Sequence, residues 1–496
     1  MYISTRGSRE RFSAAAAIKT GIAPDGGLLV PEAIPPVDSG FLAELVPLDY
    51  HRRAVRILRQ FLEDYSPQEI EDCVRAAYPE TKFDDPAVAP LVTLKGGPCV
   101  LELWHGPTSA FKDMALQLLP QLLSLALAKT GEKAEIVILV ATSGDTGKAA
   151  LEGFRDVDQT RIIVFYPHEG VSAVQRLQMV TQEGGNVAVI AVRGNFDDTQ
   201  TGVKNIFSDK PFSGRLEERG FKLSSANSIN WGRLLPQIVY YFSAYADLVK
   251  GGRCLPGQAV NFVVPTGNFG NILAGYYAKQ MGLPINRLIC AANSNNVLVD
   301  FLRTGVYDRQ RSFYKTLSPS MDILISSNLE RLLYHVSGDA AKVAGWMRQL
   351  SETGRYQVDP ACLEAIQTTF WSDWADDAQT VDTIRAVYEQ HRYLVDPHTA
   401  VAWNVYEKYR CATKDEAPAV IISTASPFKF NESVFAAVAG EEGLSGKSEF
   451  EILRELFRLT GCPVPPALAG LEGKAAKHQT VCDKEEMAGI VAGMLS

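Results

Sequence analysis

A lysine in an apolar stretch broken by glycine and proline is the first candidate for chemistry in this sequence. Lys112 lies in ELWHGPTSAFKDM, after Ala110-Phe111 and before Asp113. An apolar setting favours the neutral amine, which is a nucleophile suited to imine formation. A lysine whose stem lies along a surface helix would look the same in sequence, so Lys112 needs support from other residues.

The first glycine turn is VILVATSGDTGKAALEG, residues 137–153. It does not match a nucleotide-binding phosphate loop, since Thr142 stands five residues before Gly147 and Ala149 replaces the metal-binding hydroxyl. Backbone N–H groups at a helix start favour a carboxylate or phosphate, and Ser143 and Thr146 add hydroxyl donors. The alternative is a plain turn between strand and helix, capped by Thr146.

The second glycine turn lies in VVPTGNFGNILAGYYAK, residues 263–279. Two glycines within Gly267-Asn268-Phe269-Gly270-Asn271 let the backbone close around an anion, and a helix start follows. Here too a tight turn without a ligand is the alternative. Two such turns at the carboxyl ends of strands lie where parallel sheets usually bind ligands.

The sequence pattern around these residues predicts an α/β fold. Short apolar, β-branched runs alternate with helix-length segments, such as 148–155 and 173–183, which predicts doubly wound parallel sheets covered by helices. The predicted strands are 135–142, 161–166, 186–192, 260–265, 287–292 and 417–424.

The two ends of the chain differ from this core. The pattern of residues 39–78 predicts amphipathic helices, and Ser66-Pro67 with Glu69 marks the N-terminus of one of them. We therefore expect an N-terminal helical domain (1–90), a core (91–435) that contains a smaller subdomain at about 115–225, and a C-terminal extension (436–496) with helices at 449–460 and 484–495.

Composition excludes several classes of partner. The formal net charge of −8 argues against nucleic acid and anionic membranes as main partners, and no run approaches the ~18 apolar residues of a membrane span. The eight cysteines include no C-x-x-C pair, which disfavours metal and disulfide frameworks. We expect a cytoplasmic protein without a metal site, a monomer or homodimer that acts on a small molecule.

A phosphate cradle, a carboxylate-suited turn and an imine-forming lysine are together the parts that hold pyridoxal 5'-phosphate (PLP) and an amino acid. The motifs HGPTSAFKD, ATSGDTGKAA, SANSINWGR and VPTGNFGN resemble the threonine synthase family. GIAPDGGLLVPE, SPSMDILISSNLERLLYH and DPHTAV extend the resemblance over essentially the whole chain. It implies PLP fold type II, like the tryptophan synthase β subunit, in the longer bacterial and fungal subgroup.

The resemblance also implies roles for individual residues. Lys112 would hold the cofactor as an imine and shuttle protons. The turn Gly267, Asn268, Phe269, Gly270 and Asn271 would bind the cofactor phosphate, and Thr424 would meet the ring nitrogen. Ser143, Asp145 and Thr146 would receive the substrate carboxylate. Relatives usually carry asparagine at position 145, whereas aspartate is usual in the longer subgroup. We expect Asp145 to form a different hydrogen-bond pattern, as a protonated acid.

The implied reaction converts O-phospho-L-homoserine and water to L-threonine and phosphate. Ser228, Asn230 and Arg233 form the candidate site for the substrate phosphate, because arginine grips phosphate with two N–H groups; Lys204 and Lys429 form a weaker one. His105 and His398 suit a structural role as well as a catalytic one.

The last motif departs from the family pattern T-A-H-P-x-K-F, because this chain reads TASPFKF and Ser426 replaces histidine. That difference keeps open a phospholyase, a threonine or serine dehydratase of the same fold, and a non-catalytic phospho-metabolite binding protein.

Overall fold

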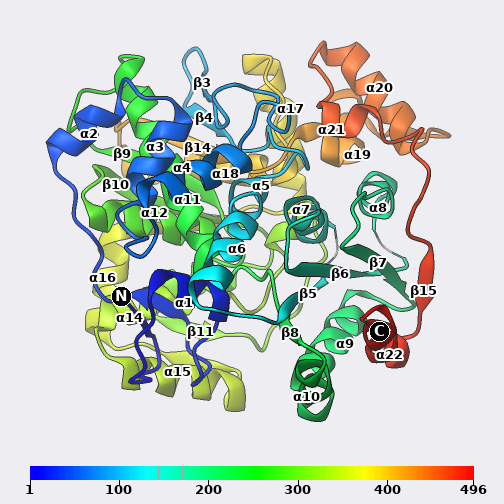
Figure 1. Cartoon of the computed structure of the whole chain (residues 1–496). Helices are drawn as coiled ribbons and strands as arrows, with labels where there is room; N and C mark the ends of the chain where they lie inside the picture. The colour runs from blue at the N-terminus through cyan, green and yellow to red at the C-terminus, as the bar shows by residue number, and fades with distance from the viewer. Residues whose placement is uncertain (143, 170, 496) are drawn as a thin grey trace.

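Two β-sheets organise the chain in the computed structural model, which describes residues 1–142, 144–169 and 171–495 (Figure 1). The larger sheet has six strands in the order β13-β10-β9-β14-β4-β3, and the smaller has five in the order β15-β7-β6-β5-β8. The strands of the larger sheet are β3 (Leu91–Thr93), β4 (Cys99–Glu102), β9 (Val260–Pro265), β10 (Ile285–Ala292), β13 (Phe370–Trp374) and β14 (Ala419–Ser423).

The larger sheet is parallel apart from its edge strand β3, which pairs antiparallel with β4. The expectation of parallel sheets is therefore wrong for β3. The reason is the short connection between β3 and β4, because only an antiparallel pair can be joined by a tight turn. The three predicted strands of this sheet match β9, β10 and β14 within about two residues.

The smaller sheet contains β5 (Glu135–Ala141), β6 (Thr160–Pro167), β7 (Val187–Val192), β8 (Phe221–Ser224) and β15 (Thr480–Cys482), all parallel. The strand β15 belongs to the C-terminal segment, yet it pairs with β7, with Thr480 opposite Ile190. The C-terminal segment thus adds a strand to the smaller sheet as well as packing on it. The sequence did not indicate this strand, because β15 has only three residues.

Most of the N-terminal helices pack against the long helix α11 (Trp231–Lys250). The predicted helix start at Ser66 is confirmed, since Ser66 and Glu69 form a capping box. Arg53 is buried and pairs with Asp247 of α11 at 2.7 Å. The helices of this part are α1 (Ala14–Thr20), α2 (Ser39–Leu45), α3 (Tyr50–Leu58) and α4 (Pro67–Ala77), beside the strand pair β1 (Tyr2–Ser4) and β2 (Leu29–Pro31).

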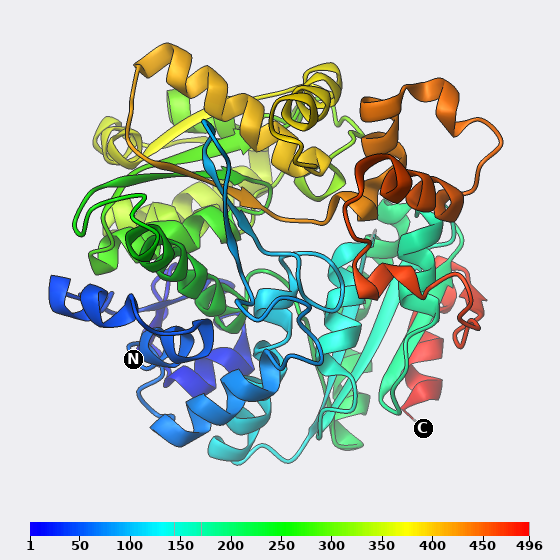
Figure 2. The same ribbon diagram turned by 90° about the horizontal axis from the view of Figure 1, so that it is seen from above.

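Helices cover both sheets, and the two ends of the chain lie on opposite sides of the molecule (Figure 2). The remaining helices up to the last strand of the large sheet are α5 (Asp113–Leu116), α6 (Leu119–Lys129), α7 (Asp145–Phe154), α8 (Ala173–Val180), α9 (Phe196–Ser208), α10 (Lys210–Glu218), α12 (Gly270–Met281), α13 (Val297–Thr304), α14 (Leu329–Ser337), α15 (Ala340–Thr353), α16 (Pro360–Thr369), α17 (Asp377–His391) and α18 (Pro397–Thr413). The strand pair β11 (Val306–Asp308) and β12 (Arg355–Gln357) lies beside them.

The C-terminal segment contains α19 (Asn431–Ala439), α20 (Glu449–Thr460), α21 (Pro466–Ala469) and α22 (Met487–Met494). The prediction of a helix at 449–460 is confirmed. Within the described residues, no helix has the length and hydropathy of a membrane span. All eight cysteines are unpaired, and no described group of His, Cys, Asp or Glu side chains could hold a metal ion.

Candidate active site

Lys112 lies at the start of α5, in a loop that leads out of β4. Asp113 holds this loop together, since its carboxylate accepts hydrogen bonds from the Thr108 N–H and hydroxyl, both at 2.8 Å. The loop lies against the end of β14, where the Phe111 N–H donates to the Thr424 carbonyl at 2.8 Å. Two segments that are distant in sequence, 106–113 and 424–430, thus form one wall of the site.

The Lys112 ammonium group faces both a hydroxyl and a carboxylate. Its Nζ donates to Ser320 Oγ at 3.3 Å and lies 3.8 Å from Asp145 Oδ2. Burial lowers the pKa of Lys112 to about 8, with Asp145 opposing the shift and Lys429 and Arg233 adding to it. A lysine with this pKa has a larger neutral fraction near neutral pH than an ordinary lysine, which is the direction that a nucleophilic amine requires.

Asp145 is an ionised carboxylate, which corrects the expectation of a protonated acid. Its Oδ1 lies 2.7 Å from the ammonium of Lys429, whose side chain is fully buried. Burial alone would raise the pKa of Asp145, but Lys429 and Lys112 hold it well below the ordinary range. Lys429 is therefore committed to Asp145 and to the Thr108 carbonyl rather than to a phosphate.

The first glycine turn is capped by Thr142 and not by Thr146. The Thr142 hydroxyl accepts the N–H groups of Gly144 and Gly147, both at 3.0 Å. This bond starts α7 at Asp145, three residues earlier than the sequence indicated. The N–H groups of Asp145 and Thr146, and the Thr146 hydroxyl, have no partner among the described residues, so they remain available to a carboxylate. Ser143 lies outside the described residues.

The second glycine turn presents an unusually long row of backbone donors. The N–H groups of residues 267–272 make no hydrogen bond to any described residue. Phe269 adopts the left-handed conformation with φ 64°, which turns the chain into α12. A Cβ added at Gly267 would lie 2.7 Å from the Ser320 carbonyl oxygen, so this backbone passes close to the loop that contacts Lys112.

Asn271 extends this cradle with a side chain. Its Oδ1 accepts hydrogen bonds from Tyr240 at 2.6 Å and Tyr241 at 2.9 Å, which fixes the amide orientation. Its Nδ2 is buried and has no partner within the described part of the chain. A buried donor of this kind is costly unless a ligand meets it, and successive N–H groups at a helix start bind phosphate.

Thr424 follows β14 and is buried, and its hydroxyl has no hydrogen-bond partner among the described residues. Ser426, the residue that departs from the family pattern, accepts the Phe428 N–H at 3.3 Å and caps the short helix at Pro427–Phe430. Its side chain is thus engaged in the backbone of its own turn.

The cluster SANSINWGR contributes one arginine to the site and one cap to the fold. Arg233 is buried, its Nη1 donates to the Ala226 carbonyl at 2.7 Å, and its Nε has no partner among the described residues. Burial lowers the pKa of Arg233 to about 10. Asn230 instead caps α11 and donates to the Ile18 carbonyl at 2.9 Å, so its Oδ1 and one of its two Nδ2 hydrogens are used within the fold.

Ser228 lies at the edge of this cluster. Its hydroxyl is 3.3 Å from that of Ser327, which in turn donates to Asn268 Oδ1 at 3.3 Å. Hydroxyl groups therefore link the Arg233 cluster to the second glycine turn. Lys204 is exposed on α9 and donates to Gln200 at 3.0 Å, so nothing associates it with this region.

Ser320, which no pattern in the sequence singled out, joins three parts of the site. Its hydroxyl contacts both Lys112 and Asp145 at 3.3 Å, and its N–H donates to His398 Nε2 at 3.2 Å. His398 Nδ1 lies 2.6 Å from Asp396, which fixes the ring as an acceptor toward Ser320. The motifs SPSM and DPHTAV contain these residues, but only the tertiary structure shows what they contact.

His105 has a structural role. It lies between Asp84 at 2.6 Å and Glu102 at 2.8 Å. Burial opposes protonation, but these two carboxylates outweigh it and raise the pKa of His105 to about 9. The ring is therefore a fixed cation near neutral pH and not a proton shuttle.

Taken together, the described residues fit PLP. The 267–272 backbone with Asn271 suits the cofactor phosphate, Lys112 supplies the amine, and Thr424 offers a neutral hydroxyl. Lys112 and the buried Lys429 lie beside one carboxylate, Asp145, and the buried Arg233 acts on Lys112, so this group of side chains has a net positive charge suited to phosphorylated ligands.

Comparison with protein families matches three segments that together cover most of the chain. A model described as threonine synthase N terminus matches residues 1–78, one described as pyridoxal-phosphate dependent enzyme matches residues 89–369, and one described as threonine synthase, C-terminal matches residues 399–491.

Individual relatives agree with these models. The chain is 43% identical over 442 residues to a threonine synthase of Pseudomonas aeruginosa, covering 89% of this chain and 91% of that protein. It is 41% identical over 437 residues to human threonine synthase-like 1, covering 86% of this chain and 58% of that protein. The crystal structure of PLP-bound threonine synthase from Brucella melitensis superposes with a TM-score of 0.88 at 39% identity, covering 100% of this chain and 98% of that one.

Proposed function

Since this chain belongs to the threonine synthase family and is a PLP-dependent lyase, we propose that its substrate is O-phospho-L-homoserine and that it forms L-threonine and phosphate. The observation that supports this substrate is the second anion site. Arg233 has a buried, unpartnered Nε, and the Ser228 and Ser327 hydroxyls link its cluster to the cofactor cradle. A substrate with one carboxylate and one phosphate needs both the first glycine turn and this cluster.

PLP would be held by the 267–271 turn through its phosphate, by Lys112 through its aldehyde carbon and by Thr424 at its ring nitrogen. When bound, PLP acts as an electron sink that stabilises negative charge on the carbon atoms of an amino acid. A neutral hydroxyl such as that of Thr424 leaves a ring nitrogen largely unprotonated, which moderates this effect.

Lys112 is the proposed general base and acid at the substrate Cα. Its pKa of about 8 gives both protonation states near neutral pH, which is the condition for taking up a proton and returning it. Ser320 Oγ, at 3.3 Å, holds the amine when it is not bound covalently. Asp145 keeps a negative charge next to that amine and next to Lys429, so one carboxylate partly offsets the charge of both ammonium groups.

The N–H groups of Asp145 and Thr146, with the Thr146 hydroxyl, are proposed to orient the substrate carboxylate. Ser143 stays part of this proposal on the resemblance alone. Arg233 and Ser228 are proposed to bind the substrate phosphate and to stabilise it as it leaves. Asn230 has no place in this set, because its amide caps α11.

The test combines holoenzyme with O-phospho-L-homoserine and measures threonine, 2-oxobutanoate and phosphate. We expect threonine and phosphate in equal amounts from the wild type and from the control variant Lys133→Ala, an exposed lysine of the turn before β5. The variant Lys112→Ala should form neither product. Phosphate release without threonine would contradict the synthase reaction.

One observation keeps a second function open. Ser426 stands where the family usually carries histidine, and its hydroxyl is used within its own turn, so it cannot supply the proton chemistry of an imidazole. If that chemistry is needed for water addition, the same site would release phosphate and 2-oxobutanoate as a phospholyase. The measured ratio of 2-oxobutanoate to threonine distinguishes the two reactions, and absence of both products would indicate a binding protein.

We further propose a cytoplasmic location for this enzyme, as a monomer or homodimer. Eight cysteines without a disulfide are typical of a reducing compartment.

A further inference from the structure

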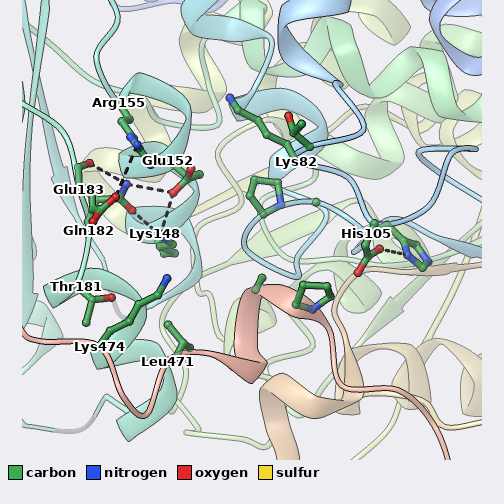
Figure 3. A pocket seen from close by; sticks show the side chains of 16 residues that line it. Lys82, His105, Lys148, Glu152, Arg155, Thr181, Gln182, Glu183, Leu471 and Lys474 are labelled. Carbon is green, nitrogen blue, oxygen red and sulfur yellow. Dashed lines mark hydrogen bonds and ion pairs between the residues drawn. The ribbon is translucent and has the colours of Figure 1, made fainter.

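Arg331 of α14 is a fully buried cation whose surroundings differ from those of other charged groups in the protein. For comparison, Lys148 lies 3.1 Å from the carboxylate of Glu152 in the cavity of about 260 Å³ between α7 and the C-terminal segment (Figure 3). Arg331 forms no such ion pair with a described residue, because the carboxylate of the adjacent Glu330 is bonded to Arg6 at 2.8 and 2.9 Å. The guanidinium charge is therefore met mainly by the dipoles of neutral groups.

The guanidinium group of Arg331 donates to acceptors from three segments of the chain. Its Nε donates to the Leu29 carbonyl of β2 at 3.0 Å, its Nη2 to the Ile229 carbonyl at 2.5 Å and its Nη1 to Asn328 Oδ1 at 2.5 Å. Burial lowers the pKa of Arg331 to about 10, so the group is still a cation near neutral pH. Lysine could not replace this arrangement, because its ammonium group is a single point charge at the end of a flexible stem.

Asn328 connects Arg331 to the second glycine turn. Because a cation can only be met by the amide oxygen, the hydrogen bond from Arg331 determines which end of the Asn328 amide faces the turn. The Nδ2 of Asn328 donates to the carbonyls of Asn268 and Ser228, both at 3.1 Å, and its backbone N–H also donates to the Asn268 carbonyl at 3.1 Å. A Cβ added at Gly270 would lie 3.5 Å from this Nδ2, so the amide also lies against the first residue of α12.

These hydrogen bonds fix the direction of donors that face away from Asn328. In a trans peptide the C=O group and the following N–H group point in opposite directions. A donor on the Asn268 carbonyl therefore orients the Phe269 N–H, which is one of the N–H groups of the turn without a partner in the described chain. The carbonyls of Ser228 and Ile229 are held in the same way within the cluster that contains Arg233.

We propose that Arg331 and Asn328 are positioning residues that hold the cofactor-phosphate turn and the substrate-phosphate cluster at a fixed separation. Both act through the backbone of these two segments. Since Arg331 also bonds the Leu29 carbonyl, the N-terminal part of the chain supports the same arrangement. The part of the proposal that concerns the substrate phosphate rests on the proposed function, whereas the part that concerns the cofactor requires only that the enzyme binds PLP.

The first test measures the dissociation constant of PLP by reconstitution of cofactor-free Arg331→Lys and Asn328→Ala. The matched control is Arg53→Lys, because Arg53 is also a buried arginine and bonds the carbonyls of Leu45 and Val46, which belong to neither phosphate site. We expect PLP to bind about ten-fold more weakly to each of the two site variants and unchanged to Arg53→Lys. Urea unfolding of the same proteins shows how much stability each one loses. A PLP affinity that falls equally in Arg331→Lys and Arg53→Lys, or in neither, would overturn the proposal.

The double variant Arg331→Lys/Asn328→Ala tests whether Arg331 acts on the turn through Asn328. We expect it to bind PLP no more weakly than Asn328→Ala alone, because the path from Arg331 is already broken. Losses that multiply to about a hundred-fold would show independent effects and overturn the relay.

The phosphorus NMR shift of bound PLP is a readout that a loss of stability alone does not move. We expect the shift at saturating PLP to change in Arg331→Lys and in Asn328→Ala and to stay at the wild-type value in Arg53→Lys. Asn328→Ala removes no charge and carries the test if Arg331→Lys does not fold. A wild-type shift together with wild-type PLP affinity in Asn328→Ala would overturn the proposal.

Steady-state kinetics with O-phospho-L-homoserine at saturating PLP tests the substrate half. We expect KM to rise at least about five-fold in Arg331→Lys with kcat within about two-fold of the wild type, and neither to change in Arg53→Lys. An unchanged KM would overturn this half. If the wild type itself forms no threonine, the proposed function fails and this half falls with it, while the PLP measurements still decide the cofactor half.

Discussion

Replacing Asp145 by asparagine removes the negative charge that lies between two buried ammonium groups. Lys429 Nζ is 2.7 Å from one carboxylate oxygen and Lys112 Nζ is 3.8 Å from the other. Asparagine has the same size and retains an oxygen that can accept the Gln175 hydrogen bond. The variant therefore tests the charge at this position and not the shape.

Removing one partner of a buried ion pair costs about 3–5 kcal/mol, because the remaining charge stays buried without compensation. We expect Asp145→Asn to lose a free energy of unfolding of this size near neutral pH. The sign of the pH dependence follows from the carboxyl pKa, which Lys429 and Lys112 hold well below its ordinary value of 3.8 although burial opposes them. The stabilisation by Asp145 is therefore complete above about pH 4 and shrinks as the pH falls further.

The assay is urea unfolding of cofactor-free wild type and Asp145→Asn, from about pH 8 down to about pH 3. The control is Asp113→Asn, because burial raises the pKa of Asp113 to about 7 against the ordinary 3.8. A carboxyl group with a raised pKa stabilises the fold while it is protonated, and this stabilisation is lost as the pH rises through about 7. Between about pH 4 and 8, the free energy of unfolding of the wild type should therefore fall by on the order of 4 kcal/mol relative to that of Asp113→Asn. As the pH rises, the free energy of unfolding of the wild type must increase relative to Asp145→Asn and decrease relative to Asp113→Asn. An Asp145→Asn protein as stable as the wild type at neutral pH would refute the assignment of Asp145 as an ionised, paired group.

Three further predictions concern the site. Arg233→Lys should raise KM for O-phospho-L-homoserine by about ten-fold or more, since lysine cannot donate two parallel hydrogen bonds. Asn230→Ala should instead leave KM unchanged and lower the free energy of unfolding by about 1 kcal/mol, the contribution of a helix cap. Steady-state kinetics measures the first effect and urea unfolding the second. Gly267→Ala should weaken PLP binding at least about ten-fold, measured by reconstitution of cofactor-free protein, because its Cβ would lie 2.7 Å from the Ser320 carbonyl oxygen; unchanged PLP affinity would contradict the close approach. His398→Phe should shift the pH profile of the reaction by leaving the Ser320 N–H without an acceptor, while an unshifted profile would show that His398 does not position Ser320.

The sequence by itself determined the fold class and the parts of the site that depend on local backbone. The strand candidates at 260–265 and 417–424 match β9 and β14, because buried parallel strands are short, continuous apolar runs. The second glycine turn was recognisable for a similar reason, since a left-handed residue and a helix start are encoded within a few positions. The motif series also indicated the family.

Only the tertiary structure decided which polar side chains meet. Asp145 was expected to be a protonated acid, yet it pairs with Lys429, a residue 284 positions away that the sequence placed near a phosphate. Asn230 looked like a ligand for phosphate and is a helix cap, because the Ile18 carbonyl lies beside it. Ser320 had no signal of its own type or spacing. Hydrogen bonds and ion pairs act over about 3 Å, so their partners are set by how distant segments pack, and no local pattern in the chain records that packing.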